Sequence, residues 1–258
     1  MSTVALPASS ARLSVVSLRG LGVRFDFDRQ GRVVTPVLRR LRRVRASSWG
    51  LEGIDLELEP GSGVALVGAT GSGKTTLLRV LAGVLPADTG EAIVRGRVGS
   101  LLAADAGLQM LLTGRENSQL LGVLAGLSVA EAKETLDILA ERARLGDAFD
   151  RPVHTYSAGM RARLGLAVIR SISPGVLLLD EVFEALDHEF RGIVENYARA
   201  LRDRGGVVVA AGHDHVALSR ICPRALWLSG GRIQVEGPFE KVIDAYRAAT
   251  SPRVAANP

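Results

Sequence analysis

The chain has 258 residues, 47% of them hydrophobic, which is enough for a well-formed core in one α/β domain with a subdomain or in two small domains. Its single cysteine, Cys222, excludes an intrachain disulfide and fits a reducing compartment, and no apolar run approaches the ~20 residues needed to span a bilayer. The start of the chain lacks a signal-peptide pattern, so we expect a cytosolic protein; its net charge of +5 fits nucleic acid, an anionic membrane surface or a solvated arginine face.

The N-terminal part predicts a strand and a basic helix. Residues 1–12 are small and polar, and we expect them to be flexible. Residues 14–25 predict a strand, in which Phe25 either stacks on an adenine base or is an ordinary strand aromatic. Residues 35–45 repeat apolar side chains every three to four positions between arginines, which predicts a short amphipathic helix. It would contact anionic lipid, a membrane partner or only solvent; nucleic acid is disfavoured because no aromatic residue interleaves the arginines.

A phosphate-binding loop is the strongest motif of the chain. Residues 49–61 alternate apolar and acidic side chains and predict a half-exposed strand, and the apolar run 63–67 predicts a buried one. Residues 76–83 then predict a helix closed by a glycine. Between the buried strand and this helix, the pattern Gly-x4-Gly-Lys-Thr is formed by Gly68, Ala69, Thr70, Gly71, Ser72, Gly73, Lys74 and Thr75, with Thr76 opening the helix.

The chemistry of such a loop is that of an anion site. Successive backbone N–H groups and the positive end of the helix converge on phosphate, and glycines let the backbone approach it. Lys74 is predicted to reach the β- and γ-phosphates of a nucleotide, and the Thr75 hydroxyl to ligate Mg²⁺.

The remaining pattern is that of an α/β chain with a helical insertion. A turn is predicted over 86–90, two short strands over 91–102, helical segments from 112 to about 150 with one helix over 128–143, and a return to the βα pattern near 156. The continuous apolar runs 176–180 and 206–211 predict central strands of a mostly parallel sheet. A closing hairpin over 225–235 and a last helix over 239–247 precede a short tail.

Acidic residues complete the predicted site. Asp180 and Glu181 follow the apolar run 176–179, so they emerge at the carboxyl end of a strand, where α/β sheets bind ligands. Asp180 is predicted to hold the Mg²⁺ shell, and Glu181 to polarise the attacking water. His213, just past the next strand, is the candidate to contact the γ-phosphate, with His215 as its competitor.

One further segment carries a family resemblance. The run formed by Tyr156, Ser157, Ala158, Gly159 and Met160 resembles the signature loop of ABC-type ATPases. Residues 176–181 are similar to that family's Walker B strand and catalytic glutamate, Asp187 to its D-loop, and His213 to its switch histidine. The resemblance implies ATP and Mg²⁺ as ligands, and a head-to-tail dimer in which one subunit's signature closes on its partner's nucleotide. It also implies a P-loop NTPase (RecA-like) core over residues 13–247, with an N-terminal antiparallel β subdomain, a helical subdomain at about 112–158, and flexible termini at 1–12 and 248–258.

The details resemble one branch of the family. The Tyr-Ser-Ala-Gly-Met-Arg-Ala-Arg signature, residues 112–117 and residues 237–246 are similar to the ATPase subunits of O-antigen, capsule and teichoic-acid exporters. This implies ATP hydrolysis that drives a lipid-linked polysaccharide through a separate permease, at the cytoplasmic face of the membrane, with no nucleic-acid partner.

The chain departs from the family at the Q-loop. The glutamine expected there is not evident, and Ala103, Asp105 and Gln109 are the residues near its place. Its absence leaves open an ATP-dependent scaffold that does not hydrolyse. The basic charge leaves open a soluble ABC-type ATPase that acts on nucleic acid or the ribosome.

Overall fold

The structure is a computed structural model that describes residues 15–27, 46–102 and 107–250. The predicted basic helix at 35–45, the terminus at 1–12, Ala103 and Asp105 lie outside these ranges. The described elements, in chain order, are β1 (Val15–Phe27), β2 (Ala46–Leu58), β3 (Gly63–Val67), α1 (Lys74–Leu81), β4 (Thr89–Arg95), β5 (Val98–Leu102), α2 (Gly114–Leu124), α3 (Val129–Glu134), α4 (Leu136–Ala143), α5 (Ala158–Ser171), β6 (Val176–Asp180), α6 (Val182–Ala185), α7 (His188–Asp203), β7 (Val207–Ala211), α8 (His215–Ile221), β8 (Arg224–Ser229), β9 (Arg232–Pro238) and α9 (Phe239–Thr250).

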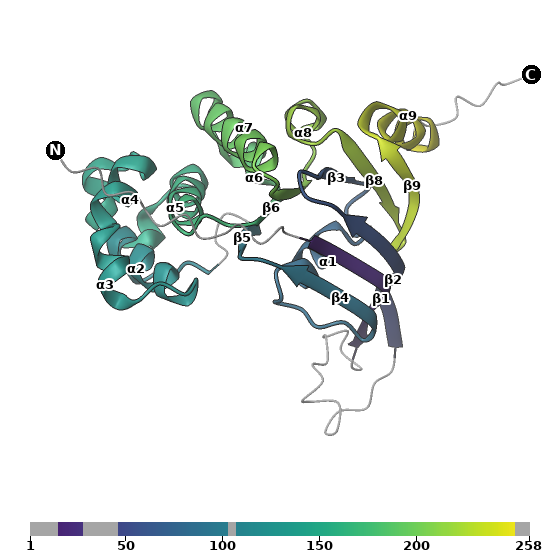
Figure 1. The fold of residues 1–258 in the computed structure, drawn as a ribbon, viewed down its shortest axis with the longest axis horizontal. Coiled ribbons are helices and arrows are strands. Elements are labelled where there is room, and N and C mark those ends of the chain that lie inside the picture. The colour runs from purple at the N-terminus through teal and green to yellow at the C-terminus, as the bar shows by residue number, and fades with distance from the viewer. Residues whose placement is uncertain (1–14, 28–45, 103–106, 251–258) are drawn as a thin grey trace, which may run out of the picture.

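A mainly parallel sheet forms the centre of the molecule (Figure 1). Its strand order is β5-β6-β7-β3-β8-β9, in which only β9 runs antiparallel to its neighbour. Strands β3, β6 and β7 are buried along their whole length, because both faces of the sheet are covered. The loops that follow β6, β7 and β3 therefore meet at one edge of the sheet, which is where the glycine loop, Glu181 and His213 stand.

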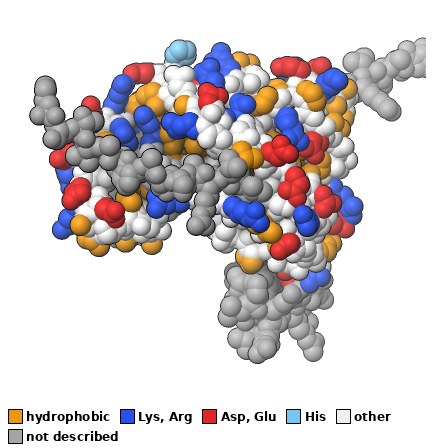
Figure 2. Space-filling model, viewed as in Figure 1, with side chains coloured by type: hydrophobic (Ala, Val, Ile, Leu, Met, Phe, Trp, Pro, Cys, Tyr) orange, Lys and Arg blue, Asp and Glu red, His pale blue; other side chains and the backbone are white. Residues whose placement is uncertain are grey.

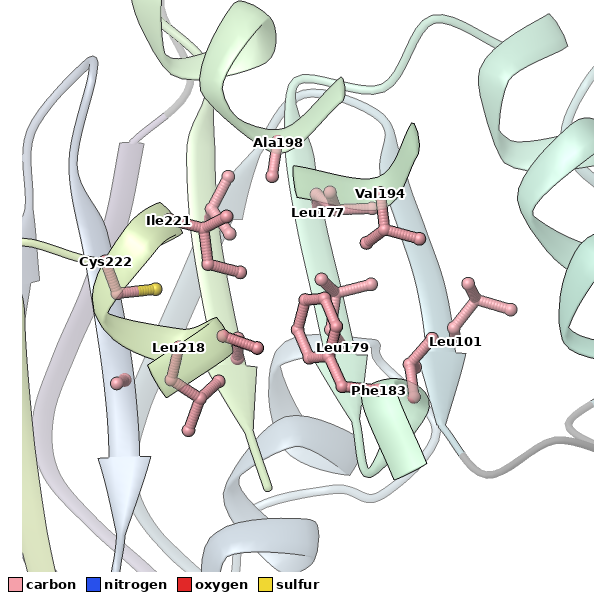
Figure 3. Packing of buried hydrophobic residues seen from close by; sticks show 14 of the residues in the cluster. Leu101, Leu177, Leu179, Phe183, Val194, Ala198, Leu218, Ile221 and Cys222 are labelled. Atoms are coloured by element: carbon pink, nitrogen blue, oxygen red, sulfur yellow. The ribbon is translucent and has the colours of Figure 1, made fainter. Parts of the chain in front are cut away.

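Each face of this sheet packs on a different layer. Leu177 and Leu179 of β6 point into a core shared with α7 and α8 (Figure 3), whereas Val176 and Leu178 point into a core shared with α1 and the second sheet. Cys222 is wholly buried in the first of these cores.

The second sheet is antiparallel, with the order β2-β1-β4. The half-exposed strand predicted over residues 49–61 is part of β2, which ends at Leu58, and its side chains alternate between buried and exposed from Ile54 to Leu58. The predicted turn at 86–90 is wrong at its end, because Thr89 and Gly90 already belong to β4 and Thr89 pairs with Gly22 of β1. The two short strands predicted over 91–102 are present, but β4 and β5 belong to different sheets.

The helical insertion lies to one side of both sheets and has its own core, centred on Phe149, Leu139 and Leu164 (Figure 1). It comprises α2, α3, α4 and two 3-10 helices, Gly146–Asp150 and Val153–Thr155, and it packs on α5. The single helix predicted over 128–143 is wrong: it is broken at Thr135, whose hydroxyl donates to the Ala132 carbonyl at 2.9 Å and so competes with the helical pattern.

The last helix is longer than predicted. It continues to Thr250, whose hydroxyl donates to the Tyr246 carbonyl at 2.8 Å. The expectation of a flexible tail from residue 248 is therefore wrong for residues 248–250, and residues 251–258 lie outside the described ranges.

Candidate functional site

The glycine loop turns directly from β3 into α1, as its sequence predicts. Gly68 has φ 148°, and a Cβ there would lie 2.2 Å from the Leu228 carbonyl oxygen. Gly73 has φ 112°, and its Cβ would lie 2.8 Å from the Gly50 carbonyl oxygen. Both positions therefore require glycine, which fixes the path of the loop against β8 and β2.

Lys74 is held on the inner side of this loop. Its Nζ donates to the carbonyl oxygens of Gly68 at 2.7 Å and Ala69 at 3.1 Å. Burial lowers the pKa of Lys74, while the carboxylates of Asp180 and Glu181 oppose that shift. The Ser72 hydroxyl is also buried and has no hydrogen-bond partner in the described part of the chain.

Asp180 faces the start of α1 from the end of β6. It is buried, and the Thr75 side chain beside it favours the charged form of its carboxyl. Burial raises the pKa of Asp180 against this opposing effect of Thr75, and the neighbouring Glu181 adds to the rise. Its Oδ1 is buried without a hydrogen-bond partner among the described residues. A buried carboxylate with a free oxygen beside a threonine hydroxyl is a fitting pair of ligands for a hard cation such as Mg²⁺.

Glu181 and His213 meet beside this pair. The Nε2 atom of His213 lies 3.7 Å from Oε1 of Glu181, and both side chains are more than half exposed. Glu181 has φ 54° and its N–H donates to the Ala211 carbonyl at 2.9 Å. The competing His215 points elsewhere, because its ring makes an edge contact with Tyr246 at 6.2 Å. Burial, followed by the nearby Arg247, lowers the pKa of His215. Of the two histidines, His213 is the one placed at the carboxylates.

Lys74, Thr75 and Glu181 line one pocket of about 320 Å³. The pocket is bounded by Phe25, Ser48, Trp49, Gly50, Thr70, Gly71, Gly73, Lys74, Thr75, Thr76 and Glu181. Phe25 packs closely over Gly50, where an added Cβ would lie 2.4 Å from the ring.

Trp49 is a pocket residue that the sequence reasoning missed. It pairs with Arg24 across β1 and β2, and the Arg24 guanidinium lies 5.9 Å from the centre of its ring. Its proximity to Phe25 follows from the strand register, in which Phe25 pairs with Ser48. The two aromatic side chains, Phe25 and Trp49, therefore line the same pocket as Lys74.

The signature residues are not in this pocket. Ser157 is exposed and caps α5, accepting a hydrogen bond from the Met160 N–H at 3.2 Å. Ala158 is exposed, and Met160 packs on the core of the helical insertion. Tyr156 is buried and donates from its hydroxyl to the Ala148 carbonyl at 2.5 Å, which anchors the loop to the insertion.

Two residues join α5 to the segment that follows Glu181. Gly159 sits so close to this segment that a Cβ would lie 2.9 Å from the Ala185 carbonyl oxygen. Asp187 caps α7 through Oδ1, which accepts from the Phe190 N–H at 2.9 Å, while its Oδ2 pairs with Arg163 of α5. The capping hydrogen bond and the Arg163 guanidinium both hold the pKa of Asp187 below its ordinary value.

Gln109 is the one Q-loop candidate that the structure describes. It is exposed at the start of the helical insertion and does not line the pocket. The buried Asn117 holds its backbone, accepting from the Gln109 N–H at 2.7 Å and donating to its carbonyl at 3.0 Å.

The fold and the pocket together define a class of protein. A glycine loop between a buried strand and a helix faces carboxylates that end a strand of the same sheet, which is the arrangement of a P-loop nucleotide-binding protein. In the described ranges, no helix has the length and apolar character to cross a membrane.

Comparisons with known proteins refine this class. The model of the family described as ABC transporter matches residues 51–184. The O-antigen export system ATP-binding protein RfbB of Klebsiella pneumoniae is 34% identical over 199 residues, which cover 77% of this chain and 81% of that protein. The teichoic acids export ATP-binding protein TagH of Lactococcus lactis is 34% identical over 198 residues, covering 77% of this chain but only 42% of the longer relative.

A solved structure has the same fold. A dimeric structure of the ATP-binding cassette MJ0796, in a post-hydrolysis state with ADP and Pi, superposes with a TM-score of 0.70 at 20% identity, covering 87% of this chain and 98% of that one. The chain belongs to the ABC transporter family, as one of its ATP-binding subunits. The predicted resemblance and fold class are confirmed.

Proposed function

We propose that this chain is the ATP-hydrolysing subunit of an exporter that drives a lipid-linked polysaccharide through a separate permease in the cytoplasmic membrane. The main support is that Lys74, Thr75 and Glu181 line the same pocket, in a chain similar to O-antigen and teichoic-acid export ATP-binding proteins. The ATPase domain of the proposal spans residues 13–247, including the helical part at about 112–158.

The nucleotide would lie along the glycine loop, with its base beside the aromatic side chains and its phosphates at Lys74. Phe25 would stack on adenine, and the backbone N–H groups of residues 68–76 would bind the phosphates. Lys74 would exchange its bonds to the Gly68 and Ala69 carbonyls for bonds to phosphate oxygens, since the ammonium group already stands inside the loop.

Thr75 and Asp180 would hold Mg²⁺, which when bound neutralises charge on the phosphates. Two observations support this pair: the Thr75 side chain lies beside Asp180 and favours its charged form, and one oxygen of that carboxylate is buried and without a partner among the described residues. Glu181 would orient and polarise the attacking water, and His213 beside it would contact the γ-phosphate.

The signature residues would act on a second copy of the chain. The Ser157 hydroxyl accepts the capping hydrogen bond of α5, so its own proton remains available to donate to a phosphate of the partner's nucleotide. The N–H groups of Gly159 and of the start of α5 would bind the same phosphate. Asp187 would lie at the same interface. We infer a head-to-tail homodimer, attached to the membrane at its cytoplasmic face through the permease.

Glu181→Gln tests this proposal. The variant should bind ATP, lose turnover and accumulate as an ATP-dependent dimer in size-exclusion chromatography with light scattering. A variant that hydrolyses ATP at the wild-type rate would remove Glu181 from the proposed role.

A pull-down of the tagged Glu181→Gln protein with ATP from detergent-solubilised native membranes tests the partner. A stoichiometric integral membrane protein would support export. Ribosomes or nucleic acid, released by salt, would instead support the soluble ATPase. On the face shown in Figure 2, basic and acidic side chains are intermingled, which gives no support to a nucleic-acid surface there.

A further inference from the structure

We propose that Glu184 is a positioning residue, which holds the loop of His213 in register with Glu181. The inference rests on the proposed function, in which these two side chains act on the same phosphate. Two short segments are concerned: the hydrolysis segment, residues 181–187, which follows β6, and the histidine loop, residues 212–214, which follows β7.

Neither side chain of the pair is held by burial. Glu181 and His213 are 59% and 58% exposed, and their 3.7 Å separation is longer than a hydrogen bond. Their relative position must therefore be set by the backbones of the two segments. Because β6 and β7 are paired in parallel up to Asp180 and Ala211, the sheet fixes the segments only at their starting points.

Beyond the strands, a side chain makes the next link. The Glu184 Oε1 atom accepts a hydrogen bond from the N–H of His213 itself, at 2.7 Å. A carboxylate acceptor makes this bond shorter and stronger than one between neutral groups. The approach depends on Gly212, since a Cβ there would lie only 3.0 Å from Glu184 Oε1.

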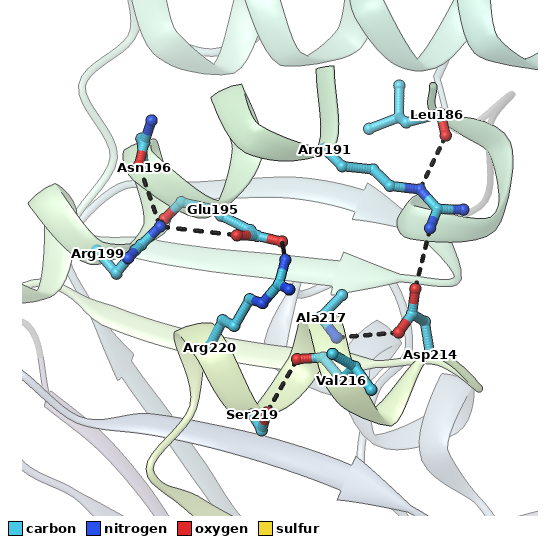
Figure 4. Close-up of polar contacts among 10 residues, drawn as sticks. All are labelled: Leu186, Arg191, Glu195, Asn196, Arg199, Asp214, Val216, Ala217, Ser219 and Arg220. Carbon is cyan, nitrogen blue, oxygen red and sulfur yellow. Dashed lines mark hydrogen bonds and ion pairs between the residues drawn. The ribbon is translucent and has the colours of Figure 1, made fainter. Parts of the chain in front are cut away.

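A second link is made by the next residue along the chain, Asp214 (Figure 4). Arg191 donates from Nε to the Leu186 carbonyl at 2.9 Å and from Nη1 to Asp214 at 3.1 Å. The histidine loop is thus tied to the hydrolysis segment both at His213 and one residue later. Glu184 is the link that bonds to the histidine directly.

Helices α7 and α8 supply a matched control. Glu195 of α7 is buried and pairs with Arg199 at 3.6 Å and with Arg220 of α8 at 3.2 Å (Figure 4). This network joins α7 to α8, as the Arg191–Asp214 link does, but it does not touch the histidine loop. Glu195→Gln should therefore change stability without changing how His213 is placed.

The experiment measures steady-state ATP hydrolysis of Glu184→Ala, Glu184→Gln and Glu195→Gln, with hydrogen exchange at residues 211–215 in nucleotide-free protein. Glu184→Ala should lower kcat about tenfold with KM for ATP within about twofold, and should speed exchange of the His213 amide. Glu184→Gln keeps an acceptor oxygen and should retain kcat within about threefold.

Three kinetic results would overturn the inference: a wild-type kcat in Glu184→Ala, equal losses of kcat in Glu184→Gln and Glu184→Ala, or an equal loss of kcat in Glu195→Gln. Unchanged exchange at His213 in Glu184→Ala would also do so, and this arm requires no hydrolysis. A wild-type protein that hydrolyses no ATP would instead contradict the proposed function, so the two failures are distinguishable.

Discussion

Glu181 combines the proposed catalytic position with a backbone conformation that opposes folding. Its φ of 54° and ψ of 27° place a non-glycine residue in the left-handed region, where the chain turns at once from β6 into α6. That conformation costs roughly 1–2 kcal/mol for an L-residue with a Cβ. Glycine avoids this cost but loses roughly 0.5–1 kcal/mol more backbone entropy on folding. We therefore expect Glu181→Gly to be about 0.5–1 kcal/mol more stable than Glu181→Gln.

The comparison with glutamine reports mainly on the strain, because both variants lack the carboxylate charge beside His213. The Glu181 side chain is 59% exposed, so its loss removes little packing. Urea unfolding followed by circular dichroism measures the difference, which corresponds to roughly 1–4 °C in Tm for a chain of this size. Both variants should lack turnover. A glycine variant equal to or less stable than the glutamine variant would refute the reasoning.

Three further outcomes are expected from the site. In the folded, nucleotide-free protein, burial raises the pKa of Asp180 above its value in the unfolded chain. As pH rises above about 4, the unfolded chain therefore releases the Asp180 proton before the folded chain does, and the folded state loses stability. Asp180→Asn should therefore unfold at higher urea than wild type at pH 7 but not at pH 3.5; equal pH dependences would contradict this. Gly159→Ala should displace α5 from the Ala185 carbonyl and weaken ATP-dependent dimerisation in light scattering, with monomer ATP affinity unchanged; an unaltered dimer would argue against it. Phe25→Leu and Trp49→Leu should each weaken binding of a fluorescent ATP analogue about 3- to 30-fold, whereas the affinity for inorganic triphosphate should not change. An unchanged Kd for the ATP analogue would show that the aromatic ring has only a structural role in its strand.

The parts of the site that follow strands were predictable from the sequence. The loop over 68–75 and Asp180 each come directly after a continuous apolar run, and such runs indicate buried parallel strands. Because parallel strands end at the same edge of a sheet, residues more than a hundred positions apart were expected to meet there.

The missed features depend on contacts that no local pattern records. Trp49 reaches the pocket through the antiparallel register of β1 and β2, which the sequence does not fix. Glu184 bonds to a backbone N–H 29 positions away. The helix over 128–143 was predicted as continuous from the capping-box spacing at Ser128, whereas it is interrupted at Thr135, whose hydroxyl donates to the Ala132 carbonyl.

The burial of Cys222 makes the chain convenient for labelling. The sequence contains no other cysteine, and this side chain is wholly enclosed, which raises the pKa of its thiol to about 12. Since the thiolate is the reactive form, maleimide reagents should leave Cys222 unmodified at neutral pH in the native protein. A cysteine introduced at an exposed position such as Glu134 would then carry the only spin label or fluorophore of each subunit. In a symmetric pair, two such labels yield one inter-subunit distance per position, measured on an otherwise native chain.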